Sequence, residues 1–431
     1  MNRNCRAYKK SRLILDSVLA IMIFAVGLYL NLQEIIQSIF DINSLFQAWI
    51  ILPVLLLILF VPRYLVNAHK SIVGFLTAFV LLVLGVHSLL QIYSYGMAAG
   101  AWAFIAYGLW IGLFIWMQYT NYRIVLRLVT LVFIWFAVLH TCVIFTEYYF
   151  GQGFLKTVTF GDSIVRNYGI ATSVSIMAMQ LAIGALLAIN YYFQAKNGVR
   201  KPLILVIFAL LVIALFLVSV RGPAAYLLLM IVFVGFARLG NQSESLLHVF
   251  LLMIFGTIFI GYYFFSNDVY TEFFLNAFNF ADEGNQGRLY KYSLGGQLFM
   301  QDWWVILVGV GSAELTQIPL SLGAAELSLE SSALKGLVEL GIIGMLPITL
   351  LIISIFYGLL KYWRYPIIRQ HVELFAILGL LVLQCLTHET FKTWIGSFYF
   401  SLALGVCTRI LVEAGFFKRP GRIVLERRGR Q

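Results

Sequence analysis

Charged residues are scarce in this chain. Only 11% of its 431 residues are Asp, Glu, Lys or Arg, whereas 61% are hydrophobic. A soluble protein of this length carries far more charge on its surface. Hydrophobic stretches of about 18 to 24 residues recur instead, and each is long enough to cross a hydrocarbon core of about 30 Å as a helix. These stretches lack the alternation of membrane β-strands. The composition therefore predicts an all-α integral membrane protein.

Cysteine is also rare, with four positions in the whole chain: Cys5, Cys142, Cys385 and Cys407. Three of them lie inside hydrophobic stretches, which argues against a disulfide framework or a zinc site. The sequence also lacks a metal-binding motif, a nucleotide-binding loop and a Ser or Cys nucleophile arrangement. We therefore expect no metal and no cofactor.

Hydrophobic periodicity predicts about twelve transmembrane helices. They fall at about 13–30, 48–62, 71–93, 100–118, 124–145, 170–193, 203–220, 223–237, 246–265, 334–360, 372–387 and 394–412. One long hydrophilic loop separates helices nine and ten. The chain thus forms one membrane domain in three parts: helices one to nine over 1–265, the loop with short helices over 266–333, and helices ten to twelve with a basic tail over 334–431. Within the loop we expect a helix near 288–301, and Trp303 and Trp304 at the membrane interface.

Basic residues are distributed unevenly over the predicted loops. With a cytoplasmic N-terminus, 23 of the 30 Lys and Arg fall on one side of the membrane. This bias is typical of cytoplasmic loops and places both termini inside. The net charge of +11 is then a topology signal and an attraction to lipid headgroups, so no nucleic-acid partner is needed.

Seven basic residues lie against this bias on the outer side: Lys156, Arg166, Arg221, Arg288, Lys291, Lys335 and Lys392. A guanidinium group is always charged and makes paired hydrogen bonds to phosphate oxygens. Three arginines gathered at one outer pocket would suit a pyrophosphate. The alternative is that each arginine reaches lipid headgroups or caps a helix, and that Arg288 pairs with a nearby acidic residue. For Arg221, Gly222 and Pro223 predict a tight hairpin that leaves the charge little freedom.

A second group of candidates is Glu330, Ser331 and Ser332, at the outer entrance to predicted helix ten. Serines cap helices well and a glutamate there favours the helix dipole, so a purely structural role is one interpretation. The functional interpretation makes Glu330 a general base for a sugar hydroxyl. Further along this helix, Lys335 and Glu339 are four residues apart and are expected to neutralise each other.

His388 and Glu389 form a third group, after helix eleven on the outer side. His388 is a candidate for substrate binding or proton transfer, or a hydrogen-bonding bystander. The glycines of "LVGVGSAE" expose backbone amides to an anion or simply form a turn.

Several short motifs in this order resemble the O-antigen polymerase (Wzy) and O-antigen ligase superfamily of bacterial envelope glycosyltransferases. They are "RNYGI", "SVRGPAAY", "NQGRLYKYS", "LVGVGS" and "ESSALKGLVELGIIG", between about 160 and 350. The resemblance implies a GT-C-like multi-span enzyme of the bacterial inner membrane, acting on its outer face without metal or nucleotide. The implied donor is a glycan on undecaprenyl pyrophosphate, with Arg221 and Arg288 neutralising the leaving group and Arg166 as a third candidate. A lipid-linked acceptor, membrane lipids, a chain-length regulator and a flippase are the implied partners.

One departure from the family favours a particular branch. Ligases carry a His-Asn pair where this chain has Glu330 and Ser331. The glutamate-serine form is more similar to a polymerase of repeat units for O-antigen, capsule or exopolysaccharide. The alternatives are a ligase that makes lipopolysaccharide, a proton-coupled transporter or flippase, and a scaffold protein.

Overall fold

The computed structural model describes a helical bundle over most of the predicted spans. It describes residues 71–97, 111–119, 122–150, 157–160, 164–167, 174–195, 200–218, 220–238, 283–311, 331–388 and 394–417, with single positions or short groups between 17 and 66. The elements within these ranges are α3 (Ile72–Tyr95), α5 (Tyr122–Phe150), β1 (Thr157–Phe160), β2 (Ile164–Asn167), α6 (Val174–Gln194), α7 (Arg200–Leu217), α8 (Arg221–Arg238), α11 (Glu283–Met300), α12 (Trp303–Val308), α14 (Ser332–Tyr362), α15 (Pro366–Gln370), α16 (Val372–Thr387) and α17 (Trp394–Glu413).

Eight of these helices coincide with predicted membrane spans. Five of them, α3, α5, α6, α14 and α17, are long and apolar enough to cross a membrane, and α7, α8 and α16 are shorter apolar helices. Residues 111–119 form the described part of the predicted span 100–118. The spans predicted at 13–30, 48–62 and 246–265 lie largely or wholly outside the described residues. The structure thus supports a membrane-embedded helical protein.

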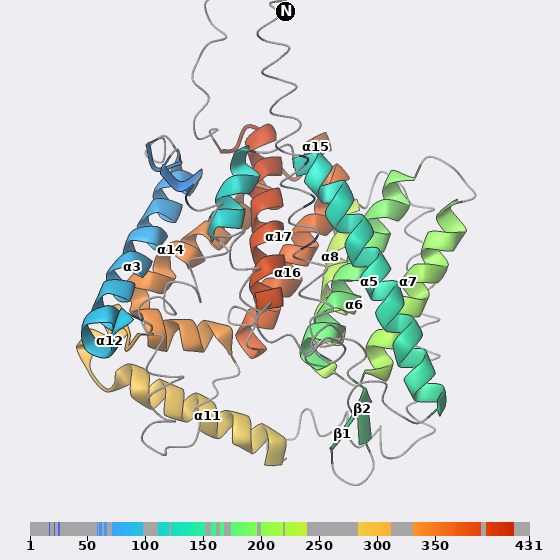
Figure 1. Ribbon diagram of the computed structural model, residues 1–431. Helices are drawn as coiled ribbons and strands as arrows, with labels where there is room; N and C mark the ends of the chain where they lie inside the picture. The colour runs from blue at the N-terminus through green and yellow to red at the C-terminus, as the bar shows by residue number, and fades with distance from the viewer. Residues whose placement is uncertain are drawn as a thin grey trace, which may run out of the picture.

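The expected all-α fold has one exception among the described residues. β1 and β2 form an antiparallel two-stranded hairpin, in which Val158 lies opposite Arg166. Figure 1 shows this hairpin and α11 at one end of the bundle and α15 at the other. We call these the hairpin end and the α15 end.

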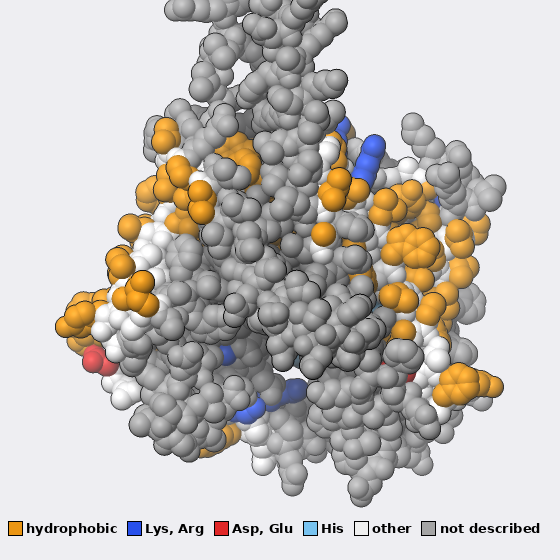
Figure 2. All heavy atoms as spheres, viewed as in Figure 1, with side chains coloured by type: hydrophobic (Ala, Val, Ile, Leu, Met, Phe, Trp, Pro, Cys, Tyr) orange, Lys and Arg blue, Asp and Glu red, His pale blue; other side chains and the backbone are white. Residues whose placement is uncertain are grey.

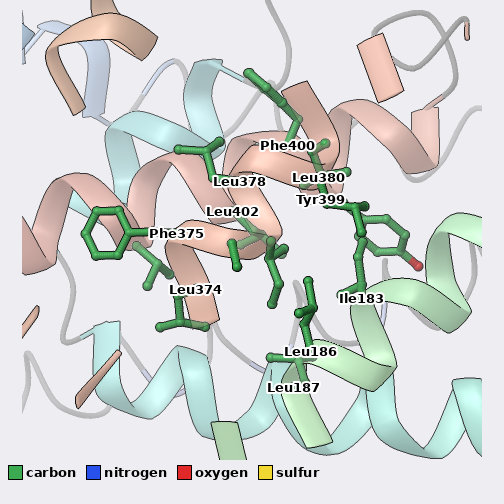
Figure 3. Close-up of a cluster of buried hydrophobic side chains, with 14 of the residues drawn as sticks. Ile183, Leu186, Leu187, Leu374, Phe375, Leu378, Leu380, Tyr399, Phe400 and Leu402 are labelled. Carbon is green, nitrogen blue, oxygen red and sulfur yellow. The ribbon is translucent and has the colours of Figure 1, made fainter. Parts of the chain in front are cut away.

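The core of the bundle is built around α6, α16 and α17. Helix α6 is buried on nearly all sides, as expected for a helix that is apolar all round. Its small residues permit close packing, because a Cβ added to Gly184 would lie 2.5 Å from the Cβ of Ala137 on α5. Figure 3 shows side chains from the three helices meeting in this core: Ile183, Leu186, Leu187, Leu374, Phe375, Leu378, Leu380, Tyr399, Phe400 and Leu402.

The outer surface of the bundle is apolar. Large hydrophobic side chains stand out from α3 and α5, including Phe75, Leu82, Leu89 and Trp135, all more than half exposed. Figure 2 shows hydrophobic side chains spread over both flanks of the molecule. Apolar surface of this extent is what a lipid-facing surface requires.

Helix α14 is broken within the span predicted at 334–360. Gly341 has φ 63° and ψ −175°, which ends a first segment at Leu340 and starts the long span that follows. Pro347 lies inside that span. The predicted continuous helix at 334–360 is therefore two helices in series, because the glycine leaves the helical backbone conformation.

The turn at Arg221 also differs from the prediction. Helix α7 ends at Leu217 and α8 begins at Arg221, so the connection runs through residues 218–220. The connection is short, as predicted, but Gly222 and Pro223 lie after it, in the first turn of α8. The missing N–H of a proline costs nothing there, since the first-turn amides of a helix have no intrahelical acceptor.

Candidate functional site

Helices α8 and α16 run antiparallel and bring Arg221 close to His388 in space. At the α15 end, Arg238 Nε, in the last residue of α8, lies 2.5 Å from Glu373 Oε1 near the start of α16. At the hairpin end, the Tyr226 hydroxyl donates to Thr387 Oγ1 at 2.9 Å. The backbone of Arg221 thus lies beside the end of α16.

The imidazole of His388 lies between these two helices. Its Nδ1 is 2.9 Å from Thr387 Oγ1, the same oxygen that Tyr226 contacts. A Cβ added to Gly222 would lie 3.3 Å from His388 Cε1 and 3.4 Å from a Tyr226 ring carbon. The His388 ring is therefore held by a hydroxyl on one side and packed against the first turn of α8 on another.

The start of α14 joins this cluster through its two serines. Ser331 is the N-cap, since its Oγ accepts a hydrogen bond from the Leu334 N–H at 3.2 Å, as the capping interpretation predicted. The Ser331 hydroxyl also donates to the carbonyl of Cys385 on α16 at 3.5 Å. The Ser332 N–H donates to the His388 carbonyl at 3.2 Å. Both serines are buried. We call Ser331, Ser332, Tyr226, Thr387 and His388 the junction cluster.

The remaining basic candidates lie at the same end of the molecule on other elements. Arg166 is in β2, where only the backbone is described, as for Arg221. Arg288 is exposed and Lys291 half-buried on α11. Helix α11 lies across the hairpin end (Figure 1), and Leu298 and Phe299 in its last turns pack on Val338 of α14. Lys and Arg side chains are visible at this end in Figure 2.

Glu330 and Glu389 lie outside the described residues. Each is the chain neighbour of a junction residue, because Glu330 precedes Ser331 and Glu389 follows His388. Their roles stay predictions.

The glycine motif "LVGVGS" has a different role from the anion site considered for it. The N–H of Val310 donates to the Val338 carbonyl and that of Gly311 to the Glu339 carbonyl, both at 2.9 Å. The N–H of Gly309 donates to Val305. The Val310 and Gly311 amides therefore join α12 to the break in α14 and the Gly309 amide caps α12, so all three bond to protein carbonyls.

Two buried ionisable groups lie on the helix segment that begins at the junction cluster. Lys335 is 4% exposed and Glu339 is fully buried, on the first segment of α14. With Ser332 they share one stripe of this helix, at positions i, i+3 and i+7. Ionisable side chains buried in a membrane helix are commonly functional.

Glu147 was missed by the sequence prediction. It is 2% exposed on α5, near the end of the helix that contacts β2. The predicted span stopped at residue 145, whereas α5 continues to Phe150. The sequence could have revealed this candidate, because an acidic residue within a hydrophobic run is unusual.

Within the described part of the chain, no three His, Cys, Asp or Glu side chains lie close enough to hold a metal ion. The chain matches no family model and no curated protein.

Proposed function

We propose that the protein is a membrane glycosyltransferase that joins undecaprenyl-pyrophosphate-linked repeat units on the outer face of the bacterial cytoplasmic membrane. The product is an O-antigen, capsule or exopolysaccharide chain. The observation that carries the proposal is the meeting, at one end of the bundle, of the first turns of α8 and α14 with the end of α16. The basic residues of α11 and β2 lie at that same end.

This arrangement supports the chemistry of glycosyl transfer from a diphosphate. The acceptor hydroxyl oxygen forms a bond to the anomeric carbon of the donor as the bond from that carbon to the diphosphate oxygen breaks. Negative charge then develops on the leaving group, where the guanidinium groups of Arg221 and Arg288 stabilise it most. The hydroxyl proton passes to a base at the junction cluster, and Glu330 and His388 are the candidates.

A direct assay tests this proposal. Purified protein in vesicles receives lipid-linked repeat units, with neither nucleotide nor ion gradient, and the products are separated by length. We expect longer chains from the wild type and a rate at least about a hundredfold lower for Arg221→Ala and Arg288→Ala. Arg364→Ala is the matched control, since Arg364 is an exposed arginine at the α15 end. A normal distribution of chain lengths from both test variants would disprove the role proposed for Arg221 and Arg288.

The same assay separates the alternatives. A ligase would move one complete glycan onto an added lipid A core and would not lengthen the chain. A proton-coupled transporter or flippase would move unchanged units across the membrane when a proton gradient is imposed. One observation favours the transporter: His140 is fully buried on α5 beside Gln180, whose Nε2 donates to the Tyr399 hydroxyl at 2.8 Å. Buried polar groups of this kind occur in proton relays.

A further inference from the structure

The first segment of α14 is a short helix that is anchored at both ends. At its start, Ser331 and Ser332 are hydrogen-bonded to Cys385 and His388. At its other end the helix breaks at Gly341, which frees the carbonyls that the next turn would have used. Between these ends it carries the buried stripe of Ser332, Lys335 and Glu339.

The broken end is held by the end of α12. The Val310 and Gly311 amides satisfy the carbonyls of Val338 and Glu339. The two backbones touch directly, because a Cβ added to Gly309 would lie 2.3 Å from the Glu339 oxygen, and one added to Gly341 would lie 2.4 Å from the Leu307 oxygen. Only glycine fits at either position.

Two side chains of α3 complete this contact. The His87 ring lies within hydrogen-bonding reach of the carbonyls of Val308 and Leu340, one on each side of the contact, and its neutral form has one N–H to donate to either of them. Gln91, one turn further along, donates from Nε2 to the Val310 carbonyl at 3.4 Å. Both side chains are buried, at 5% exposed each. Helix α3 thus places two polar side chains, His87 and Gln91, at the point where α12 meets the break in α14.

We propose that His87 and Gln91 are positioning residues of the site. They hold the broken end of α14 against α12, and through the rigid first segment they set where Ser332 and Lys335 lie relative to His388. The role rests on the proposed function, because the reaction is what the segment is positioned for. Buried hydrogen bonds of this kind fix a structure more by the cost of leaving a group unpaired than by their net strength.

The contact itself can be tested without an activity assay. Val310 and Val338 pack together and share a backbone hydrogen bond, so a Val310→Cys/Val338→Cys pair should oxidise readily in a background without the four native cysteines. We expect His87→Leu to slow this disulfide formation about tenfold. Leu89→Ala is the control, because Leu89 is 66% exposed on the same helix.

Activity then tests the positioning role. We expect His87→Leu and Gln91→Leu to lower kcat about tenfold per folded molecule and to leave KM for the lipid-linked donor within about twofold. Oxidising the cysteine pair in the His87→Leu protein should restore kcat, and reduction should remove it again. His87→Gln, which keeps a donor, should recover part of the rate.

Two results would overturn the proposal: unchanged cross-linking and kcat in His87→Leu, or a lost kcat that the disulfide does not restore. Slower cross-linking in a protein that never lengthens lipid-linked chains would instead uphold the contact and refute the proposed function.

Discussion

At the scale of single residues, His388 is the point where three helices meet. Its ring nitrogen lies beside Thr387, its carbonyl accepts from Ser332, and its Cε1 packs near Gly222. A small displacement of this ring would change its contacts with Thr387 and with the first turn of α8. Catalytic geometry tolerates little displacement, because a shift of about 1 Å can cost a hundredfold in rate.

Gly222→Ala tests how closely the ring must be placed. The new methyl group would lie 3.3 Å from His388 Cε1 and 3.4 Å from the Tyr226 ring, so the imidazole must move by a few tenths of an ångström. We expect about tenfold lower chain-lengthening activity with normal membrane insertion.

Gly235→Ala is the matched control on the same helix. Nothing lies within 4 Å of the added Cβ, so we expect full activity and a slight gain in thermal stability. Equal activity of the two alanine variants would show that the position of the His388 ring does not matter.

At the scale of elements, α14 is the helix that departs most from its sequence pattern. Its first segment buries an ammonium group and a carboxyl group, Lys335 and Glu339, in the part of the bundle nearest the hairpin end. The sequence predicts that these two groups neutralise each other, and removing one member of a buried ion pair typically costs about 3–5 kcal/mol, because the other charge is left uncompensated. The losses of stability caused by replacing Lys335 and by replacing Glu339 are therefore expected not to add.

A double-mutant cycle measures this coupling. We expect Lys335→Met to lower thermal stability strongly, and Lys335→Met/Glu339→Gln to recover most of the loss, with a coupling energy of about 1 kcal/mol or more. Additive effects on the unfolding temperature would contradict the pairing. A double variant that is stable but inactive would assign one of the two groups a role in the reaction as well.

At the scale of the whole molecule, the two ends of the bundle differ in their polar contacts. The α15 end is held by ion pairs, Arg238 with Glu373 and Arg123 with Glu413, the second at 3.4 Å. His371 lies there, buried between α15 and α16. Burial, with the positive charges of Arg123 and Arg238, lowers the pKa of His371 from 6.5 to about 4.

This pKa predicts a loss of stability in mild acid. The unfolded chain binds a proton at His371 below about pH 6.5, whereas the folded protein excludes it until about pH 4. The stabilisation is therefore complete above pH 6.5 and disappears as the pH falls to 4, a change of roughly 3 kcal/mol at most.

Unfolding temperatures at pH 8 and pH 5 check this expectation. The wild-type protein should lose more stability between these two pH values than a His371→Gln variant, which has no group to protonate there. Equal losses in the two proteins would show that His371 does not exclude a proton in the folded state.

The sequence by itself determined the class of the protein and the course of most described helices. Length and polarity of a hydrophobic run decide whether it can span a membrane, and this needs no knowledge of neighbours. The Ser331 cap followed from local chemistry in the same way. The break at Gly341, the two-stranded hairpin and the end of α5 beyond Glu147 did not, because a glycine, a turn or a single acid in a run fits several local structures.

Only the tertiary structure decided which of the candidates lie together. Tyr226 and Thr387 are 161 residues apart in the chain, and Ser332 meets His388 only because α14 and α16 pack at the same end. His87 and Gln91 look like ordinary polar residues of a membrane helix until α12 and the break in α14 are placed against them. Long-range hydrogen bonds depend on how helices pack, and no local pattern in the sequence records that packing.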